Sequence, residues 1–66
     1  MKPHETRLKS ELEDLQGKID GLEVFIRLNP AMDELSEEAI KLVLEQFDLM
    51  RLYAAVLEQR LKMANE

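Results

Sequence analysis

Two runs of apolar residues with heptad spacing constrain this chain more than any other feature of its sequence. The first run advances in alternating steps of four and three, through Leu8, Leu12, Leu15, Ile19, Leu22 and Ile26. The second run alternates in the same way, through Ile40, Val43, Phe47, Met50, Ala54, Leu57 and Leu61. Such spacing places all members of a run on one stripe of an α-helix. The pattern therefore predicts two long helices, at about residues 4–28 and 36–63.

The segment between the two runs carries signals that end one helix and begin the next. Asn29-Pro30 ends the first helix, because the residue before a proline is pushed out of the helical conformation. Ser36 is a favourable N-cap, and the two glutamates that follow it suit the positive end of a helix dipole. A connection this short folds long helices back on each other. We therefore expect an all-α fold, an antiparallel helical hairpin, with one domain over residues 1–66.

The second helix has more apolar surface than a hairpin covers. A further apolar row, spaced by seven, consists of Leu42, Leu49, Val56 and Met63, and Leu44, Leu52 and Ala55 widen it. A two-helix hairpin covers one stripe of each helix, so this row would remain a large exposed patch in a monomer. We expect it to meet another subunit in a homo-oligomeric helical bundle, a dimer or tetramer, with Leu42, Leu49 and Val56 at the interface.

Gly17 and Gly21 lie one turn apart on the face of the first helix that points away from its apolar stripe. Each glycine costs a helix about 1 kcal/mol relative to alanine. One interpretation is that packing tolerates two defects. The other is that a neighbouring helix or a ligand approaches the backbone closely, which places both glycines at the oligomer interface.

A polar line runs along the edge of the second apolar stripe, where Gln46, Tyr53 and Arg60 are spaced by seven and Met50 lies beside them. Tyrosine offers a flat face to a base, arginine a bidentate fork to a phosphate, and glutamine an amide that can read a base edge. The structural interpretation is a solvated rim, with Arg60 paired to an acid on the other helix. Periodicity leaves both interpretations open.

Composition argues against several classes of function. The chain has no cysteine, and its one histidine, His4, lies close to the N-terminus. No nucleophile–base pair or metal-ligand set can be assembled in the predicted core, so we expect no enzyme activity, no metal and no cofactor. With 14 acidic and 9 basic residues and a net charge of −5, the basic residues do not cluster. We therefore expect no binding to duplex nucleic acid or to a membrane surface.

A wider set of residues carries a family resemblance over about residues 5–61. The set comprises Glu11, Leu15, Ile19, Leu22, Phe25 and Ile26 in the first half, and Leu35, Leu42, Gln46, Met50, Tyr53, Leu57 and Arg60 in the second. This pattern resembles a group of very small bacteriophage proteins that includes sponges, which are non-enzymatic helical oligomers that sequester nucleotide immune signals. Anti-CBASS sponges hold cyclic dinucleotides, and anti-Thoeris sponges hold cyclic ADP-ribose-type signals.

The resemblance implies a ligand site and a cellular location. It makes Gln46, Tyr53 and Arg60 ligand-binding residues, with Phe25 and Met50 packed beside the base, in a protein of the host cell cytoplasm. One position departs from the pattern, because members of the group often carry a lysine where this chain has a glycine, immediately before Leu22.

Two alternatives follow from the residues themselves. The protein could be a helical adaptor or inhibitor that binds a host protein through its surplus apolar row, or a structural oligomer without a ligand.

Overall fold

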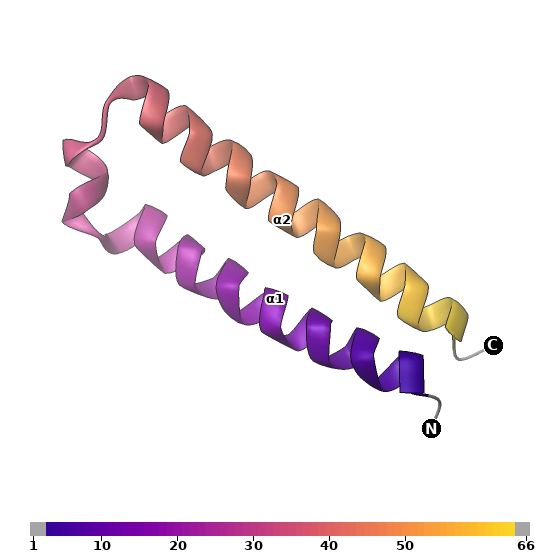
Figure 1. Ribbon diagram of the computed structural model, residues 1–66. Helices are drawn as coiled ribbons and strands as arrows, with labels where there is room; N and C mark the ends of the chain where they lie inside the picture. The colour runs from indigo at the N-terminus through magenta and orange to yellow at the C-terminus, as the bar shows by residue number, and fades with distance from the viewer. Residues whose placement is uncertain (1–2, 65–66) are drawn as a thin grey trace.

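The computed structural model describes residues 3–64 and contains both predicted helices (Figure 1). Helix α1 spans Pro3–Leu28 and helix α2 spans Glu37–Ala64, and a short 3-10 helix, η1, spans Pro30–Glu34 between them. The two long helices run antiparallel, side by side, so that α1 begins at the end of the molecule where α2 stops (Figure 1). The predicted all-α hairpin is confirmed.

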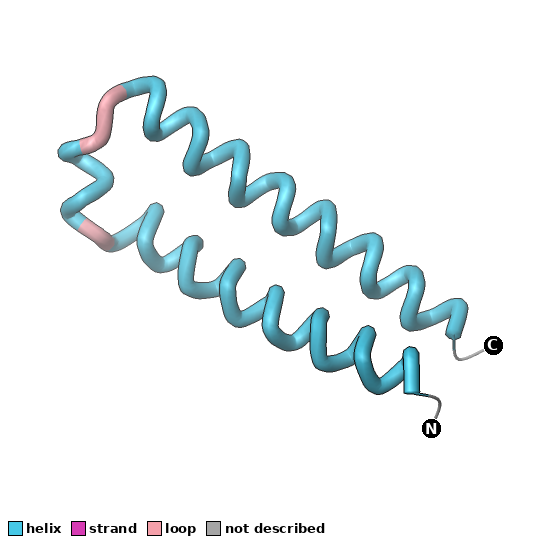
Figure 2. Tube along the Cα trace, viewed as in Figure 1, coloured by secondary structure: helices cyan, strands magenta, loops and turns pink. Residues whose placement is uncertain are grey.

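Local hydrogen bonds explain where the helices stop and start. Asn29 adopts an extended conformation, with φ −83° and ψ 122°, and its side-chain oxygen accepts a hydrogen bond of 2.9 Å from the backbone N–H of Ala31. The Ser36 hydroxyl accepts a bond of 3.1 Å from the backbone N–H of Ala39, which satisfies one of the free donors at the start of α2. The predicted stop and cap are confirmed. The helical turn of η1, which Figure 2 shows between two short loops, was not predicted.

The core lies between the two predicted stripes. Its buried members are Leu8, Leu15, Ile19, Ala54 and Leu57, and Leu12, Phe47, Met50 and Leu61 pack against them. Leu57 has no exposed surface at all. Near the turn the same stripes are only half-buried, at Leu22, Ile26, Ile40 and Val43. The apolar seams are therefore confirmed, and they close most tightly in the half of the hairpin away from η1.

A broad apolar surface of α2 remains outside this core. Leu42, Leu49, Leu52, Val56 and Met63 are each more than half exposed, and we call them the α2 apolar face. The predicted surplus is thus a property of the single chain. Neither α1 nor α2, as described over residues 3–64, has a stretch apolar enough to span a lipid bilayer.

Candidate functional site

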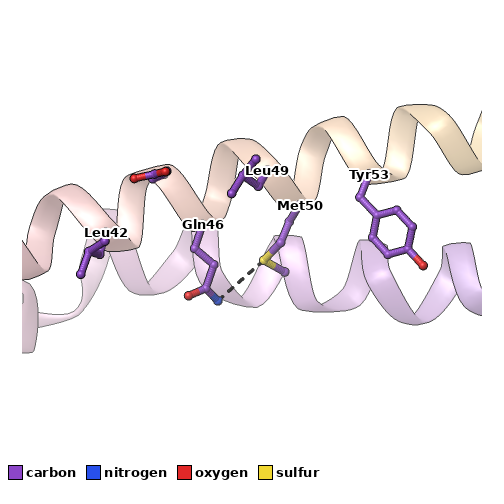
Figure 3. Close-up of a pocket in the computed structure, with 6 residues that line it drawn as sticks. Leu42, Gln46, Leu49, Met50 and Tyr53 are labelled. Atoms are coloured by element: carbon purple, nitrogen blue, oxygen red, sulfur yellow. Dashed lines mark hydrogen bonds between the residues drawn. The ribbon is translucent and has the colours of Figure 1, made fainter.

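A shallow hollow on α2 brings together residues from two separate sequence predictions. It has a volume of about 550 Å³ and is lined by Leu42, Glu45, Gln46, Leu49, Met50 and Tyr53 (Figure 3). Three of these are predicted ligand residues, and two are predicted interface residues. The candidate ligand line and the candidate oligomer interface therefore share one surface, which we call the α2 hollow.

Tyr53 bounds one end of the hollow and is positioned by α1. Its hydroxyl donates a hydrogen bond to a carboxylate oxygen of Glu11, 42 residues earlier in the chain. Figure 3 shows the ring extending from α2 across α1, and 46% of the residue surface is exposed. Because the phenol proton is engaged by Glu11, the hydroxyl oxygen and the ring face are what Tyr53 presents to a ligand.

The pKa of Tyr53 reports the same contact. The hydrogen bond to Glu11 raises this pKa above the ordinary tyrosine value of about 10, and desolvation and the negative charge of Glu11 act in the same direction. The positive charge of Arg60 acts in the opposite direction. Tyr53 is therefore a neutral phenol at physiological pH, held between an acidic and a basic side chain.

Gln46 and Met50 lie at the centre of the hollow. The Gln46 amide nitrogen donates to the Met50 sulfur over 3.9 Å, and both side chains project from the same side of α2 (Figure 3). Thioether sulfur is a weak acceptor, so this contact orients the amide without consuming much of its hydrogen-bonding capacity. The Gln46 amide is therefore available to a ligand in the hollow.

Arg60 is exposed and lies outside the hollow, about 10.5 Å along the helix axis from Tyr53. Within residues 3–64 it forms no ion pair, so the pairing with an acid on the other helix that the solvated-rim interpretation expects is not found. The ion pair in this part of the chain joins Arg27 and Glu23, at 3.1 Å on α1. Arg60 thus keeps a guanidinium that can pair with an anion.

The remaining predicted residues lie elsewhere. Phe25 is half-buried in a second hollow of about 440 Å³, lined by Gly21, Val24, Phe25, Leu28, Asn29 and Pro30. The single chain does not bring Phe25 to Gln46 and Tyr53. Gly17 and Gly21 are exposed, and an added Cβ would meet no atom within 4 Å at either position. Any close approach to these glycines therefore needs a second molecule.

Two residues of the site were absent from the sequence prediction. Glu11 was recognised only as part of a family pattern, and its contact with Tyr53 depends on how the helices align. Glu45 was not singled out, although its spacing from Leu42 and Leu49 places it beside them on the helix. That spacing is the signal that could have identified it.

Side chains of the kinds that ligate metals do not gather at one place in the described part of the chain. No group of three or more histidine, aspartate or glutamate side chains there lies close enough to hold a metal ion. The hollow itself combines apolar walls with an amide, a phenol and one carboxylate. Such a lining suits binding of a flat, partly polar molecule.

Comparison with known proteins identifies one family. No curated protein and no solved structure matches this chain. The model of the Sequestin family matches residues 2–63, which cover nearly the whole sequence. This chain therefore belongs to the Sequestin family.

Proposed function

We propose that this protein is a bacteriophage sponge that binds a nucleotide defence signal and holds it without cleaving it. The signal class is a cyclic dinucleotide or a cyclic ADP-ribose-type molecule, such as CBASS and Thoeris defences use, and the site of action is the host cell cytoplasm. One observation carries the proposal: the half-exposed Tyr53 ring bounds an apolar hollow that also contains Gln46, and Arg60, which forms no ion pair within residues 3–64, lies nearby. The family name is consistent with a sequestering role.

Each of these side chains matches one part of a nucleotide. A base can stack on the Tyr53 ring, whose orientation is set by Glu11. The Gln46 amide can bond the base edge, and the Arg60 guanidinium can bond a phosphate in bidentate fashion. The leucine and methionine side chains supply the apolar contact that most small-molecule sites require.

Sequestration sets a requirement on affinity and therefore on enclosure. A signal that works at micromolar concentration must be bound with about −8 kcal/mol or better. The hollow of a single chain is shallow and formed by one helix, so most of a bound ligand would stay in water. A second subunit that covers the α2 apolar face would enclose the ligand, and we propose a homo-oligomer, a dimer or tetramer, as the active form.

Ligand retention tests this proposal directly. The purified protein would be mixed with a panel of cyclic dinucleotides and cyclic ADP-ribose isomers, filtered, heated, and the released ligand checked for integrity. We expect one class of ligand to be retained intact at a fixed ratio per subunit. No retention across the panel, or recovery of a cleaved product, would contradict the proposal.

Two variants locate the site once a ligand is retained. We expect Tyr53→Ala and Arg60→Ala each to weaken binding about tenfold to 100-fold, since a stacked base and a charged hydrogen bond contribute about 1–3 kcal/mol each. The matched control is Arg51→Ala, which removes an exposed arginine on the other flank of α2, where its guanidinium lies 5.7 Å from the Phe47 ring centre. Equal losses in all three variants would argue against a site at the hollow.

The exposed apolar face also favours a second candidate function, inhibition or bridging of a host protein. A partner helix could lie along Leu42, Leu49 and Val56. In that case, Leu42→Glu, Leu49→Glu or Val56→Glu would release the host protein, while Tyr53→Ala and Arg60→Ala would leave it bound. Co-purification from phage-infected cells with each variant distinguishes the two functions.

A further inference from the structure

The α2 hollow has the residue spacing of an unfilled helix-packing site. Leu42, Glu45, Gln46 and Leu49 stand at positions i, i+3, i+4 and i+7, and Gln46, Leu49, Met50 and Tyr53 repeat the same spacing one turn later. Four residues so spaced surround the gap into which a side chain of a facing helix inserts in knobs-into-holes packing. The hollow is thus two adjacent holes that α1 does not fill.

The same face of α2 also carries the side chains that such holes accept. Four residues of the α2 apolar face alternate along the helix with the three polar residues that are spaced by seven. In steps of four and three, the order is Leu42, Gln46, Leu49, Tyr53, Val56, Arg60 and Met63. This second heptad seam is about 32 Å long. A helix that presents both the knobs and the holes of one seam is complementary to another copy of itself.

Charge selects the direction in which two such helices pair. The first hole contains the carboxylate of Glu45, and the basic side chain of the seam is Arg60. With the helices parallel and in register, Glu45 would meet the Glu45 of the second copy, and Arg60 would meet its Arg60. An antiparallel arrangement instead brings Arg60 of one copy to Glu45 of the other, twice by symmetry, and opposite charges favour that register.

We propose that α2 of a second copy docks antiparallel on the α2 apolar face and places its Arg60 over the mouth of the hollow, opposite Glu45. One turn before Arg60, Val56 of the second copy then packs against Leu49 at the edge of the second hole, so that the Tyr53 ring stays open to a ligand. The two-fold axis passes close to Leu52, so Leu52 meets Leu52 of the second copy. Each hollow is completed by the other chain.

This arrangement deepens the proposed function and rests on it only for the identity of the ligand. Arg60 lies outside the hollow of its own chain, whereas Gln46 and Tyr53 line it. Docking of a second copy brings a guanidinium to Gln46 and covers the hollow at the same time. Phosphate and base recognition would therefore come from different subunits, with two equivalent sites in each dimer.

Cysteine cross-linking tests the register, because the chain contains no cysteine of its own. We expect Leu52→Cys to form a disulfide-linked dimer under mild oxidation. Gln59→Cys is the matched control on the same face: in the antiparallel register the two thiols introduced at this position would lie about 21 Å apart along the axis and would not react. A mixture of Glu45→Cys and Gln59→Cys should form the mixed dimer. A Leu52→Cys protein that stays monomeric, or a Gln59→Cys protein that links to itself as fast, would overturn the proposal.

Charge exchange provides a second test that does not depend on disulfide geometry. We expect Glu45→Arg and Arg60→Glu each to weaken self-association at least tenfold, as measured by sedimentation without nucleotide. The double variant E45R/R60E restores the opposite charges and should recover most of that loss. A double variant that associates as weakly as either single variant would overturn the register.

Nucleotide retention by the linked Leu52→Cys dimer separates this proposal from the proposed function. Linked dimers that retain no member of the nucleotide panel would contradict the sponge and leave the register intact. Retention by a protein that fails both the cross-linking and the charge-exchange tests would contradict the register and leave the sponge intact.

Discussion

At the scale of single residues, the contact between Tyr53 and Glu11 is the feature that most shapes the candidate site. It fixes the ring across α1, and it engages the phenol proton, so that the hydroxyl oxygen remains an acceptor. A ligand at this end of the hollow therefore meets two acceptors, one phenolic and one carboxylate. We expect the site to favour a base that presents N–H donors there.

The single tyrosine makes this contact measurable without a label. The chain has one tyrosine and no tryptophan, so absorbance near 295 nm during an alkaline titration follows Tyr53 alone. We expect the pKa of Tyr53 to fall toward about 10 in Glu11→Ala, because the hydrogen bond and the negative charge that raise it are removed. We expect it to rise further in Arg60→Ala, because the opposing positive charge is lost.

The direction in which the pKa of Tyr53 shifts also determines how folding stability depends on pH. Because the pKa of Tyr53 is higher in the folded chain than in the unfolded chain, the contact contributes its full stabilisation below pH 10. That contribution is lost as the pH rises through the folded-state pKa. The free energies of unfolding measured with denaturant at pH 8 and above pH 10 should therefore differ less in Glu11→Ala than in the unsubstituted protein. An unchanged tyrosine titration in Glu11→Ala would contradict the contact itself.

The sequence predicted the relative positions of residues where helical spacing alone decides them. Gln46, Met50 and Tyr53 line one hollow because residues at i, i+4 and i+7 share a face of any helix. The contact from Tyr53 to Glu11 required the axial alignment of α1 and α2, which no local pattern encodes. Phe25 lies in a different hollow for the same reason, since its position relative to α2 depends on tertiary packing.

At the scale of elements, α1 is the helix weakened by its own composition, because Gly17 and Gly21 interrupt it. We expect Gly17→Ala and Gly21→Ala each to stabilise the hairpin by about 1 kcal/mol, since alanine is the better helix former and nothing lies within 4 Å of either new Cβ. Urea unfolding followed by circular dichroism at low protein concentration measures this change.

Protein concentration distinguishes the two interpretations of the glycines. If they serve a close approach by a second chain, the alanine variants will be more stable than the unsubstituted protein when dilute and will self-associate more weakly when concentrated. If they are tolerated defects, stability will rise at every concentration. A loss of stability in dilute solution would contradict the open surroundings of both glycines.

Element boundaries were more predictable than the connection between them. Proline at position 30 and the Ser36 cap act within a few residues, and their hydrogen bonds lie where local rules place them. The 3-10 turn of η1 could not be read from the sequence in the same way. It depends on two hydrogen bonds, one from the backbone N–H of Ala31 to the Asn29 side chain and one from the backbone N–H of Leu35 to the Met32 carbonyl. Several other turn geometries are compatible with the same residues.

At the scale of the whole molecule, a small core is combined with a large apolar surface. Among the side chains that the structure describes, five are buried, and an equal number of large apolar residues on the α2 apolar face are more than half exposed. Chains of this size bury too little surface to be very stable alone. Self-association through α2 would add burial on the side that α1 leaves open.

Substitutions at two leucines of α2 distinguish an effect on folding from an effect on self-association. We expect Leu49→Asp to leave the hairpin helical and to remove the concentration dependence of its Tm, because Leu49 is exposed in the single chain. Leu44→Asp is the matched control, since Leu44 is an exposed leucine outside the α2 apolar face, and its Tm should still rise with concentration. Thermal melts at several concentrations, with mass by light scattering, measure both. A concentration-dependent Tm that persists in Leu49→Asp would contradict association through this face.

The small hydrophobic core affects how the sequence of such a protein can evolve. Because most positions outside the two seams are exposed, a substitution at almost any of them costs little folding free energy. The hairpin can therefore accept new residues around the hollow without first acquiring compensating changes elsewhere. In the proposed sponge, the binding surface could therefore follow a change in the recognised nucleotide while the hairpin persists.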